Sequence, residues 1–530
     1  MKHEPISDHR STVDLQNSRR WPRMSASSVA FTFVLSGILV LCYANRPLWH
    51  TDLWDHVNYG RKMLQTGALP TTEPLVPLAA GAPMVNTAWG AQVFMAAVLS
   101  STCLGLPALQ FGHGLLVVIG LAAVGQAVRK NSGSTLGAVI AVGAMLAVNW
   151  QQFLVIRPQI VGVTFYSVVL ALLATDQLRR RWVRCMVPLL FVAWANLHGS
   201  FAMGLTLMGV WAAGQAVKAW WTSKSVRAAL RCDAVQRLLW LIPVCAAAAL
   251  LTPNGISVYL EILRIGGLQN IQSMYEWGPL TLSMKQGKAT LIVVCLLVLA
   301  TVLSPKRLQL ELTLSLIVFG GLAVWSSRML NWFGPVVGVA LGLHAASAWQ
   351  RWRHKKSDSA GEAAKSPDRR ALFTAANVGI CFLAFAFSNL GVQTLGGSPL
   401  SPTKLLSSRT PITMAEFLNS KSLAPRNPVF VPAEWAGYVF YATDGRVMPF
   451  VNLHVHVMPE KLWSDYMHIM LGQRRAIELL NDYDVDLVVT DRLRNRYLIE
   501  RLLAANEFRL RYKDSQAVVF QRTGTTFDAD

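Results

Sequence analysis

Charged side chains are scarce in this chain of 530 residues, of which only 15% are Asp, Glu, Lys or Arg. An ordinary soluble domain carries about 25%. The hydrophobic residues, 53% of the chain, are instead gathered in long blocks such as "SVAFTFVLSGILVLCYA" and "TLIVVCLLVLATVL". A helix of this length can cross a hydrocarbon core of about 30 Å. The composition therefore excludes an ordinary soluble protein and predicts a polytopic helical membrane protein.

Several familiar sequence patterns are also missing. The 7 cysteines show no spacing typical of a metal site, and none lies in the polar C-terminal region, so we interpret them as small packing residues. That region has no glycine-rich phosphate loop. The chain shows neither an internal repeat of solenoid or propeller period nor a sustained heptad.

Acidic residues are the minority among the charges, 29 against 49 basic ones, which gives a formal net charge of +20. Much of the basic excess lies in clusters between apolar blocks, at 19–23, 179–184, 224–237 and 351–356. Lys and Arg enrich the cytoplasmic loops of membrane proteins, so the clusters indicate orientation and not nucleic-acid binding. The first block lacks a clear cleavage site, which favours an uncleaved signal anchor after a cytoplasmic tail, 1–24.

The apolar blocks predict about eleven membrane spans within a transmembrane domain, 25–396. The spans lie near 25–46, 107–128, 134–155, 159–177, 184–197, 200–217, 238–253, 288–304, 308–326, 329–349 and 372–396. The segment 89–105 must lie as an interfacial or re-entrant helix, because only then do the later basic clusters all face the cytoplasm. We expect a bacterial inner-membrane protein with a cytoplasmic N-terminus.

This topology brings polar features from separate parts of the chain to the outer face. They are the outer loop 47–88, "IRPQI" at 156–160, "ANLHGS" at 195–200, "SSRMLN" at 326–331 and the 254–287 loop. Polar groups at the ends of membrane helices usually line a water-filled cavity or pathway. Their convergence is the main functional inference from the residues themselves.

The C-terminal region, 397–530, differs in kind and is predicted to be a small periplasmic α/β domain. A linker rich in Pro, Ser and Gly comes first. The segments "NPVFVP", "VDLVVTD", "FRLRYKD" and "AVVFQR" are typical of short strands. The segments "EKLWSDYMHIM", "RRAIELLNDY" and "RNRYLIERLLAANE" predict amphipathic helices.

Asp52 and His56 follow the first span in "DLWDHVNYG". If this stretch is helical, the two side chains share a face at i, i+4 spacing and Asp55 points elsewhere. A carboxylate here suits a general base, or a ligand of a divalent cation on a phosphate-bearing substrate. A helix cap is an equally good interpretation, with Thr51 or Asp52 accepting hydrogen bonds from the first turn.

Arg157 and Gln159 stand at a break between two apolar blocks. An arginine there can snorkel to the interface, or it can bind an anionic substrate, because its planar fork matches phosphate oxygens. Asn196 and His198 interrupt another apolar stretch, which is costly unless they line a polar cavity. The alternative is that His198 is a neutral histidine whose hydrogen bonds are made inside the bundle. We favour a functional role for it.

Other polar residues of the outer face are weaker candidates: Glu73, Glu276, Arg328 and Asn331. For Glu73 we favour a carboxylate that is exposed to solvent and has no functional role. Trp89 and Gln92 are interpreted as membrane anchors. His454 and His456 alternate in "NLHVHV", and without a third ligand this pattern predicts an exposed strand face and not a metal site.

Four of these elements together resemble motifs of the GT-C superfamily of polytopic membrane glycosyltransferases, in a bacterial branch. They are "DLWDHVNYG" at 52–60, "GALP" at 67–70, the Arg-Pro-Gln triplet at 157–159 and "NLHG" at 196–199. The tail, with "WAGYVFYATDGRV" and "WSDY", fits the same pattern. The resemblance implies an all-α GT-C-like bundle with a small extracytoplasmic domain.

The resemblance also implies the chemistry, which is transfer of a sugar from a lipid-phosphate-linked donor to a lipid or glycan acceptor on the outer face. Catalysis is then expected at Asp52 and His56. Substrate binding is expected at Arg157, Gln159, Asn196, His198, Glu73 and Arg328. Related chains often carry an acidic residue where Gln159 stands, so a requirement for a divalent cation stays open.

Two other functions stay open at this point. A transporter or flippase would suit many spans with buried polar groups, but it predicts inverted repeats, which the sequence does not show. A non-catalytic envelope assembly protein would use the C-terminal domain to bind a partner. It would be favoured if Asp52, Arg157 and His198 lay far apart.

Overall fold

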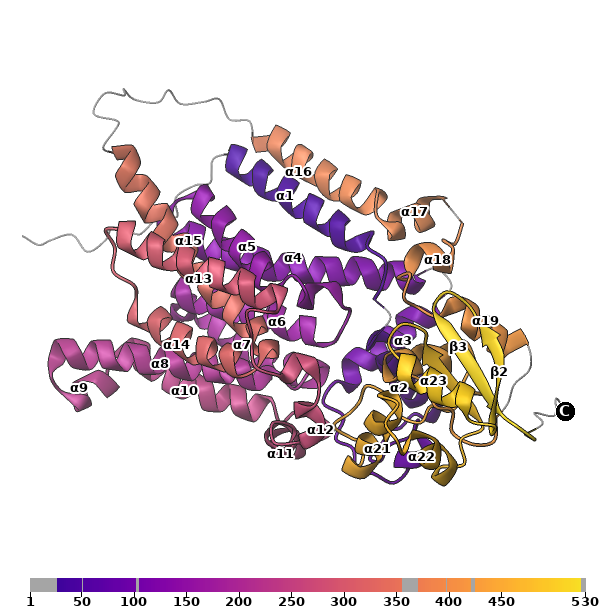
Figure 1. The fold of residues 1–530 in the computed structure, drawn as a ribbon. Helices are drawn as coiled ribbons and strands as arrows, with labels where there is room; N and C mark the ends of the chain where they lie inside the picture. The colour runs from indigo at the N-terminus through magenta and orange to yellow at the C-terminus, as the bar shows by residue number, and fades with distance from the viewer. Residues whose placement is uncertain are drawn as a thin grey trace, which may run out of the picture.

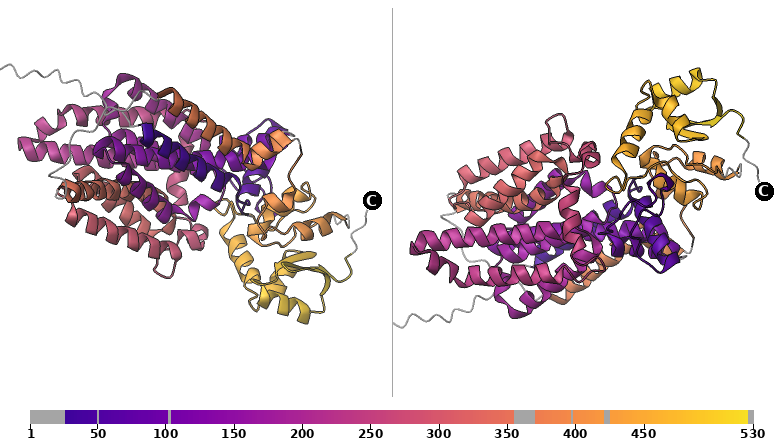
Figure 2. Two further views of the ribbon diagram at one scale, coloured as in Figure 1. Left: turned by 90° about the horizontal axis from the view of Figure 1, so that it is seen from above. Right: turned by 90° about the horizontal axis from the view of Figure 1, so that it is seen from below.

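The computed structural model describes residues 26–49, 51–101, 104–354, 370–396, 398–420 and 425–525. A bundle of long helices carries a smaller mixed domain at one end (Figure 1, Figure 2). The predicted cytoplasmic tail, 1–24, and part of the basic cluster at 351–356 lie outside the described residues.

Each apolar block predicted above forms a helix. The bundle helices are α1 (Ala26–Ala44), α4 (Gly105–Ser132), α5 (Thr135–Asn149), α6 (Gln159–Ala174), α7 (Arg181–Leu197), α8 (Phe201–Ser223), α10 (Asp233–Ala248), α13 (Lys285–Leu303), α14 (Leu310–Trp325), α15 (Leu330–His354) and α16 (Arg370–Ala386). Within the described residues, three helical segments are long and apolar enough to cross a membrane: Gly105–Ser132, Lys285–Leu303 and Ser327–Arg353. The predicted number of spans is therefore larger than the number that helix length and composition establish.

The last predicted span, 372–396, is not one continuous helix. It divides into α16 and α17 (Asn389–Gly396), which are bent by 82° from one another. Ser388 causes the break, because its hydroxyl accepts a hydrogen bond from the Gly391 N–H at 3.0 Å and so starts a new helix. If the bent pair counts as one span, four segments pass the same test of length and composition among the described residues.

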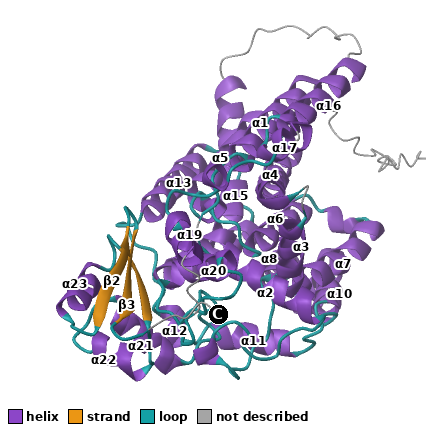
Figure 3. Cartoon of the chain, turned by 90° about the vertical axis from the view of Figure 1, so that its right-hand side faces the viewer, coloured by secondary structure: helices purple, strands orange, loops and turns teal. Residues whose placement is uncertain are grey.

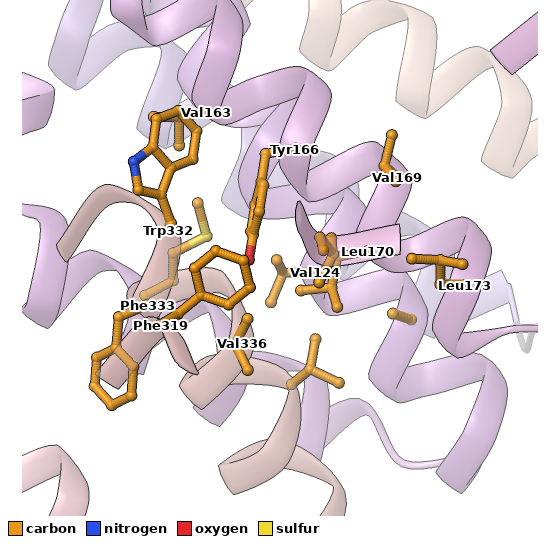
Figure 4. Close-up of a cluster of buried hydrophobic side chains, with 14 of the residues drawn as sticks. Val124, Val163, Tyr166, Val169, Leu170, Leu173, Phe319, Trp332, Phe333 and Val336 are labelled. Atoms are coloured by element: carbon orange, nitrogen blue, oxygen red, sulfur yellow. The ribbon is translucent and has the colours of Figure 1, made fainter. Parts of the chain in front are cut away.

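The centre of the bundle is packed with large apolar side chains (Figure 4). Tyr166 of α6 makes edge-to-face contacts with Phe319 at 5.4 Å and with Trp332 at 5.3 Å between ring centroids. All three rings are almost completely buried. Trp332 of this aromatic cluster also lines a cavity described in the next section.

The outer loop 47–88 folds into α2 (Leu53–Thr66) and η1 (Pro77–Ala79), and α3 (Trp89–Ser100) follows it. Helix α3 has 12 residues and spans about 18 Å, and like α5, α6 and α14 it is an apolar helix of fewer than 18 residues. Its interfacial position stays a prediction. It crosses α2 at Gly60, where a Cβ atom would lie 2.0 Å from the Gln92 carbonyl oxygen. Only glycine permits this close crossing.

Shorter helices complete the connections. They are η2 (Gln152–Leu154), η3 (Gln177–Arg179), α9 (Val226–Leu230), α11 (Ser257–Ile265), α12 (Gln269–Gln272), η4 (Tyr275–Trp277) and η5 (Ser327–Met329). Helices α11, α12 and η4 form the loop before α13, and they lie beside the C-terminal domain (Figure 1).

The C-terminal domain contains a three-stranded antiparallel sheet of order β1-β3-β2 (Figure 3). Its elements are α18 (Pro402–Leu405), α19 (Ile412–Ser420), α20 (Ala433–Ala442), α21 (Glu460–Met470), α22 (Ala476–Asp482), β1 (Leu487–Asp491), α23 (Arg496–Ala504), β2 (Phe508–Lys513) and β3 (Ala517–Arg522). Three predicted strands and three predicted helices are confirmed. The fourth predicted strand, "NPVFVP", is wrong, because its residues make only isolated bridges at Val429 and Phe430.

The domain does not stand apart from the membrane bundle. Tyr59, Met63 and Leu75 of the outer loop region share one hydrophobic core with Phe450 and Trp463 of the C-terminal domain. Leu48, just after α1, pairs with Leu406 of the predicted linker. The outer loop and the C-terminal domain therefore pack as one unit at this end of the bundle.

Candidate active site

Two cavities meet where the bundle faces the C-terminal domain. The bundle cavity, about 350 Å³, is lined by residues of α2, α8, α11, α14 and the 453–456 loop. The interdomain cavity, about 950 Å³, is lined by the 150–159 and 273–286 segments and by α21. The wall between them contains the residues that line both: Asp52, Arg157, Gln159, Met274, Glu276, Arg328 and Leu453.

Asp52 precedes the first residue of α2, as the helix-cap interpretation requires, but its side chain makes no capping hydrogen bond. That interpretation is therefore wrong for the side chain. The carboxylate forms an ion pair with Arg157 instead. The backbone of Asp52 has φ 25°, which is rare for a residue other than glycine. Such strain persists where the surrounding structure enforces it, often at functional sites.

The carboxylate of Asp52 belongs to a network of four charges. Arg157 also donates from Nη1 to Glu276 at 2.7 Å, and Arg328 forms an ion pair with the same carboxylate. Burial raises the pKa of Asp52, and the neighbouring Arg157 guanidinium opposes that rise. Burial also acts to raise the pKa of Glu276, but the two guanidiniums outweigh it and lower that pKa to about 2. The network holds two positive and two negative groups.

His56 lines the bundle cavity together with Asp52. The buried Gln92 amide nitrogen lies 3.1 Å from Nδ1 of His56, and an amide nitrogen can only donate. The neutral ring therefore carries its proton on Nε2. Burial, assisted by nearby positive groups, lowers the pKa of His56 to about 3. Gln92, predicted to be a membrane anchor, is in fact the residue that fixes this tautomer.

His198 follows α7 and lines the same cavity. The Ser200 N–H donates to its Nδ1 at 3.1 Å, so this ring also carries its proton on Nε2. Burial and the nearby Arg328 charge lower the pKa of His198 to about 3. Both histidines are thus neutral near pH 7, each with one N–H available for a ligand.

Six of the eight predicted site residues line the bundle cavity: Asp52, His56, Arg157, Gln159, His198 and Arg328. The other two, Asn196 and Glu73, line neither cavity. The Asn196 amide donates to the Leu251 and Val192 carbonyls at 2.8 Å and accepts from Trp89 at 3.1 Å. It joins α7 to α3 and to the loop that follows α10.

Glu73 is buried, so the solvated interpretation is wrong. Its carboxylate accepts hydrogen bonds from the Tyr59 hydroxyl at 2.5 Å and from the N–H groups of Leu75 and Val76. The Tyr59 hydroxyl in turn accepts from the Asn452 amide at 3.0 Å. These contacts fix the outer loop and attach it to the C-terminal domain.

Asp55 has a similar connecting position. Its side chain is 3% exposed, accepts from the Leu453 N–H at 3.2 Å and packs against Gly437. A Cβ atom at Gly437 would lie 2.5 Å from the Asp55 carboxylate, which explains the glycine in "WAGYV". Beside it, Asn58 donates to the Gly437 carbonyl at 2.8 Å. The motif of the first loop therefore also forms the contact surface for α20.

The prediction that His454 and His456 form an exposed strand face is wrong. Both lie in a non-strand loop, and both line the bundle cavity. The ring of His454 stacks on Tyr59 at 4.2 Å and meets the edge of His56 at 5.2 Å. The alternation of the two residues with valine gave no sign that this loop turns inward.

Among the described residues, no group of three or more His, Cys, Asp and Glu side chains is arranged to hold a metal ion. The requirement for a divalent cation stays an open prediction. The carboxylates of Asp52 and Glu276 are both paired with arginines. The wall combines two carboxyl groups, two guanidiniums and neutral N–H donors, which suits proton removal beside a bound phosphate.

Comparison with known proteins gives a fold-level result. No protein-family model matches the chain, and no curated protein matches it. The apo oligosaccharyltransferase of Archaeoglobus fulgidus is similar in structure, with a TM-score of 0.55 and 12% identity over 89% of this chain and 70% of that one. The same enzyme tethered to an acceptor peptide has a TM-score of 0.52 and 11% identity over 94% and 74%.

The mycobacterial arabinofuranosyltransferase AftD is also similar, with a TM-score of 0.51 and 14% identity over 94% of this chain and 42% of that chain. These similarities confirm the fold that the motifs implied. The chain has the fold of these membrane glycosyltransferases, a bundle of helices with a small mixed domain that contains a three-stranded sheet.

Proposed function

We propose that this protein transfers a sugar from a lipid-phosphate-linked donor to an acceptor hydroxyl on the outer face of a bacterial inner membrane. One observation carries the proposal. Asp52, Arg157 and His198 come from three distant parts of the chain and line one cavity, and Asp52 stands in the wall that this cavity shares with a second one.

The bundle cavity suits the donor. Part of its lining is apolar and includes Met203, Ile262 and Leu322. Trp325, which also lines it, is 57% exposed, so a lipid chain can approach it. Arg157 and Arg328 line the same cavity and suit a phosphate, whose oxygens guanidinium groups bind in pairs. The cavity thus offers an apolar lining to the lipid chain and two guanidiniums to the phosphate.

The interdomain cavity suits the acceptor. It is the larger of the two, and Lys285, Glu434 and Arg494 make part of its lining polar. An acceptor hydroxyl that reaches the shared wall would lie beside Asp52. Asp52 takes the proton as the hydroxyl oxygen bonds to the anomeric carbon, and the bond from that carbon to the donor phosphate breaks. The phosphate leaves with its lipid, while Arg157 and Arg328 balance its charge.

In this scheme His56 and His198 act as hydrogen-bond donors. Their Nδ1 atoms already accept hydrogen bonds, and their low pKa values keep the rings neutral. A neutral imidazole N–H can stabilise the oxygen of a leaving phosphate without carrying a charge into the cavity. We therefore propose that Asp52, and not His56, is the base.

The alternatives have less support. A transporter needs a route through the bundle, yet Trp332 at the cavity wall packs on Tyr166, which packs on Phe319 in the filled core (Figure 4). An assembly protein would not need Asp52, Arg157 and His198 in one cavity. The charged wall between two cavities favours catalysis over both.

Lipids that copurify with the protein test the proposal. The full chain, extracted from membranes in mild detergent, is expected to carry polyprenyl phosphate or its glycosylated form, detectable by mass spectrometry. The Arg328→Ala variant should lose most of this lipid, whereas Arg475→Ala, at an exposed arginine that lines neither cavity, should retain it. The proposal would be contradicted if the wild type carried no polyprenyl phosphate and only ordinary phospholipid, in the same amount as the two variants.

A further inference from the structure

His454 is a buried imidazole that no protein group satisfies. His454 is 8% exposed and lines the bundle cavity. Neither of its ring nitrogens has a hydrogen-bond partner among the described residues. Buried polar atoms in folded proteins are almost always paired, so an unpaired ring at a cavity wall indicates a ligand or water on the cavity side.

The ring is held in place by contacts that leave both nitrogens free. Its face stacks on Tyr59 at 4.2 Å with an interplanar angle of 21°. The Asn452 side chain accepts from the backbone N–H of His454 at 2.9 Å and donates to the Tyr59 hydroxyl at 3.0 Å. Tyr59 is fixed by Glu73 at 2.5 Å. A chain of hydrogen bonds therefore orients this imidazole without using it.

The loop around His454 is clamped from two sides. Asp55 of α2 accepts from the Leu453 N–H at 3.2 Å. On the other side, Asn270 donates to the Met458 carbonyl at 2.8 Å and Arg264 donates to the His456 carbonyl at 3.1 Å. A loop held by both the outer loop and the 254–287 loop presents its side chains in a fixed geometry, as selective recognition requires.

The chemistry of this wall differs from that of the arginine wall. His454, His56 and His456 are clustered, with ring centroids 5.2 Å and 5.4 Å from His454. Burial lowers the pKa of each, so the rings are neutral. A neutral imidazole offers one donor and one acceptor. Hydroxyl groups on a compact ring match this pattern, whereas a phosphate matches the arginines.

We propose that His454 binds a hydroxyl group of the sugar carried by the lipid phosphate, and that this loop of the C-terminal domain thereby sets which sugar the bundle cavity accepts. The inference rests on the proposed function, since it assumes a glycosylated lipid phosphate in that cavity. It adds a specificity-determining residue that none of the sequence motifs contains.

Binding measurements on the full chain in detergent separate sugar recognition from phosphate recognition. The probes are undecaprenyl phosphate and the same lipid phosphate bearing glucose, galactose, mannose or arabinose, each titrated by native mass spectrometry. The wild type is expected to bind at least one sugar-bearing lipid about tenfold more tightly than the bare lipid phosphate, the value of one or two added hydrogen bonds.

Two substitutions identify the ring nitrogens as the cause. His454→Phe keeps an aromatic ring on Tyr59 but removes both nitrogens, so it should abolish the preference for the sugar and leave binding of bare undecaprenyl phosphate unchanged. His454→Asn restores a donor and an acceptor and should recover part of the preference. His468→Phe, on α21 and outside both cavities, is the control and should behave as the wild type.

The outcomes distinguish this inference from the function on which it rests. A His454→Phe variant that keeps the full preference would overturn the inference, as would a wild type that binds bare and glycosylated lipids equally. Equal weakening of both lipids in His454→Phe would also overturn it, because the residue would then act on the fold or on the phosphate. Failure of the wild type to bind any of the five lipids would contradict the proposed function itself.

Discussion

Arg157 forms an ion pair with Asp52, and the same guanidinium donates to Glu276 at 2.7 Å. The proposed base and the proposed phosphate ligand therefore hold each other in place in the wall between the two cavities. Burial raises the pKa of Asp52 and the Arg157 guanidinium opposes that rise. A bound phosphate would have to share Arg157 with two carboxyl groups.

Arg157→Lys tests the need for a guanidinium. A lysine keeps the positive charge but offers a single ammonium in place of the planar fork, so it cannot contact Asp52 and a second anion in the same geometry. We expect undecaprenyl phosphate to bind this variant about tenfold more weakly than the wild type. Arg496→Lys, at an exposed ion pair on α23, is the matched control. Unchanged affinity in Arg157→Lys would show that the fork does not bind the phosphate.

Glu276→Gln should have the opposite effect on the same binding measurement. Glu276 is ionised, because its pKa is about 2, and it occupies both arginines that a phosphate needs. Removing its charge frees these donors, so undecaprenyl phosphate should bind roughly tenfold more tightly. Glu478→Gln, an exposed carboxylate on α22, should leave the affinity as it is. Weaker binding in Glu276→Gln would mean that Glu276 positions the arginines and does not compete for them.

Tyr59→Phe tests the attachment of the C-terminal domain. The lost hydroxyl leaves the buried Glu73 carboxylate and the Asn452 amide without that partner, which should lower the free energy of unfolding by about 1–3 kcal/mol. The melting temperature of the detergent-solubilised protein measures this change. Tyr497→Phe, at an exposed tyrosine of α23, should have no effect. An equal melting temperature for Tyr59→Phe and the wild type would show that the Tyr59 hydroxyl does not stabilise the attachment of the C-terminal domain.

Asp55 predicts a pH dependence of stability. Burial raises its pKa from 3.8 to about 8, so between these values the folded protein retains a proton that the unfolded chain has released. The free energy of unfolding therefore falls as the pH rises from about 4 to 8. Below about pH 4 Asp55 is protonated in both states, and the stability linked to its proton is fully present.

In Asp55→Asn this contribution disappears, because the amide does not titrate. The decrease in melting temperature between pH 5.5 and pH 8.5 should be smaller in this variant than in the wild type. Asp444→Asn, at an exposed aspartate near Arg61, should keep the wild-type decrease. A decrease of equal size in Asp55→Asn would show that Asp55 is ionised across this range.

Much of the site could be predicted because its residues interrupt apolar blocks. A charge such as Arg157 or Arg328 at the end of a membrane helix is conspicuous, and the alternation of basic clusters places several such ends on one face. The same reasoning could not separate ligand-binding groups from internal ones. Asn196 and Glu73 interrupt or follow apolar segments in the same way, yet tertiary contacts satisfy them completely.

The remaining errors come from contacts between segments far apart in the chain. The cap interpretation of Asp52 used only the residues next to it, whereas the ion pair with Arg157 decides where its side chain points. His454 seemed to lie on an exposed strand because two alternating histidines carry no information about the Tyr59 ring that covers them. The break between α16 and α17 depends on one serine hydroxyl within an apolar run.

The most direct test of the central claim compares cells that express the wild type with cells that express Asp52→Asn in a strain lacking the native gene. If Asp52 is the base of a sugar transfer, its loss should slow the reaction by about 10²–10⁴-fold. Mass spectrometry of lipid-linked and surface glycans should then show one glycan missing and its lipid-linked donor accumulated, with equal amounts of membrane-inserted protein. Identical glycan profiles at equal protein levels would contradict the claim that Asp52 is catalytic.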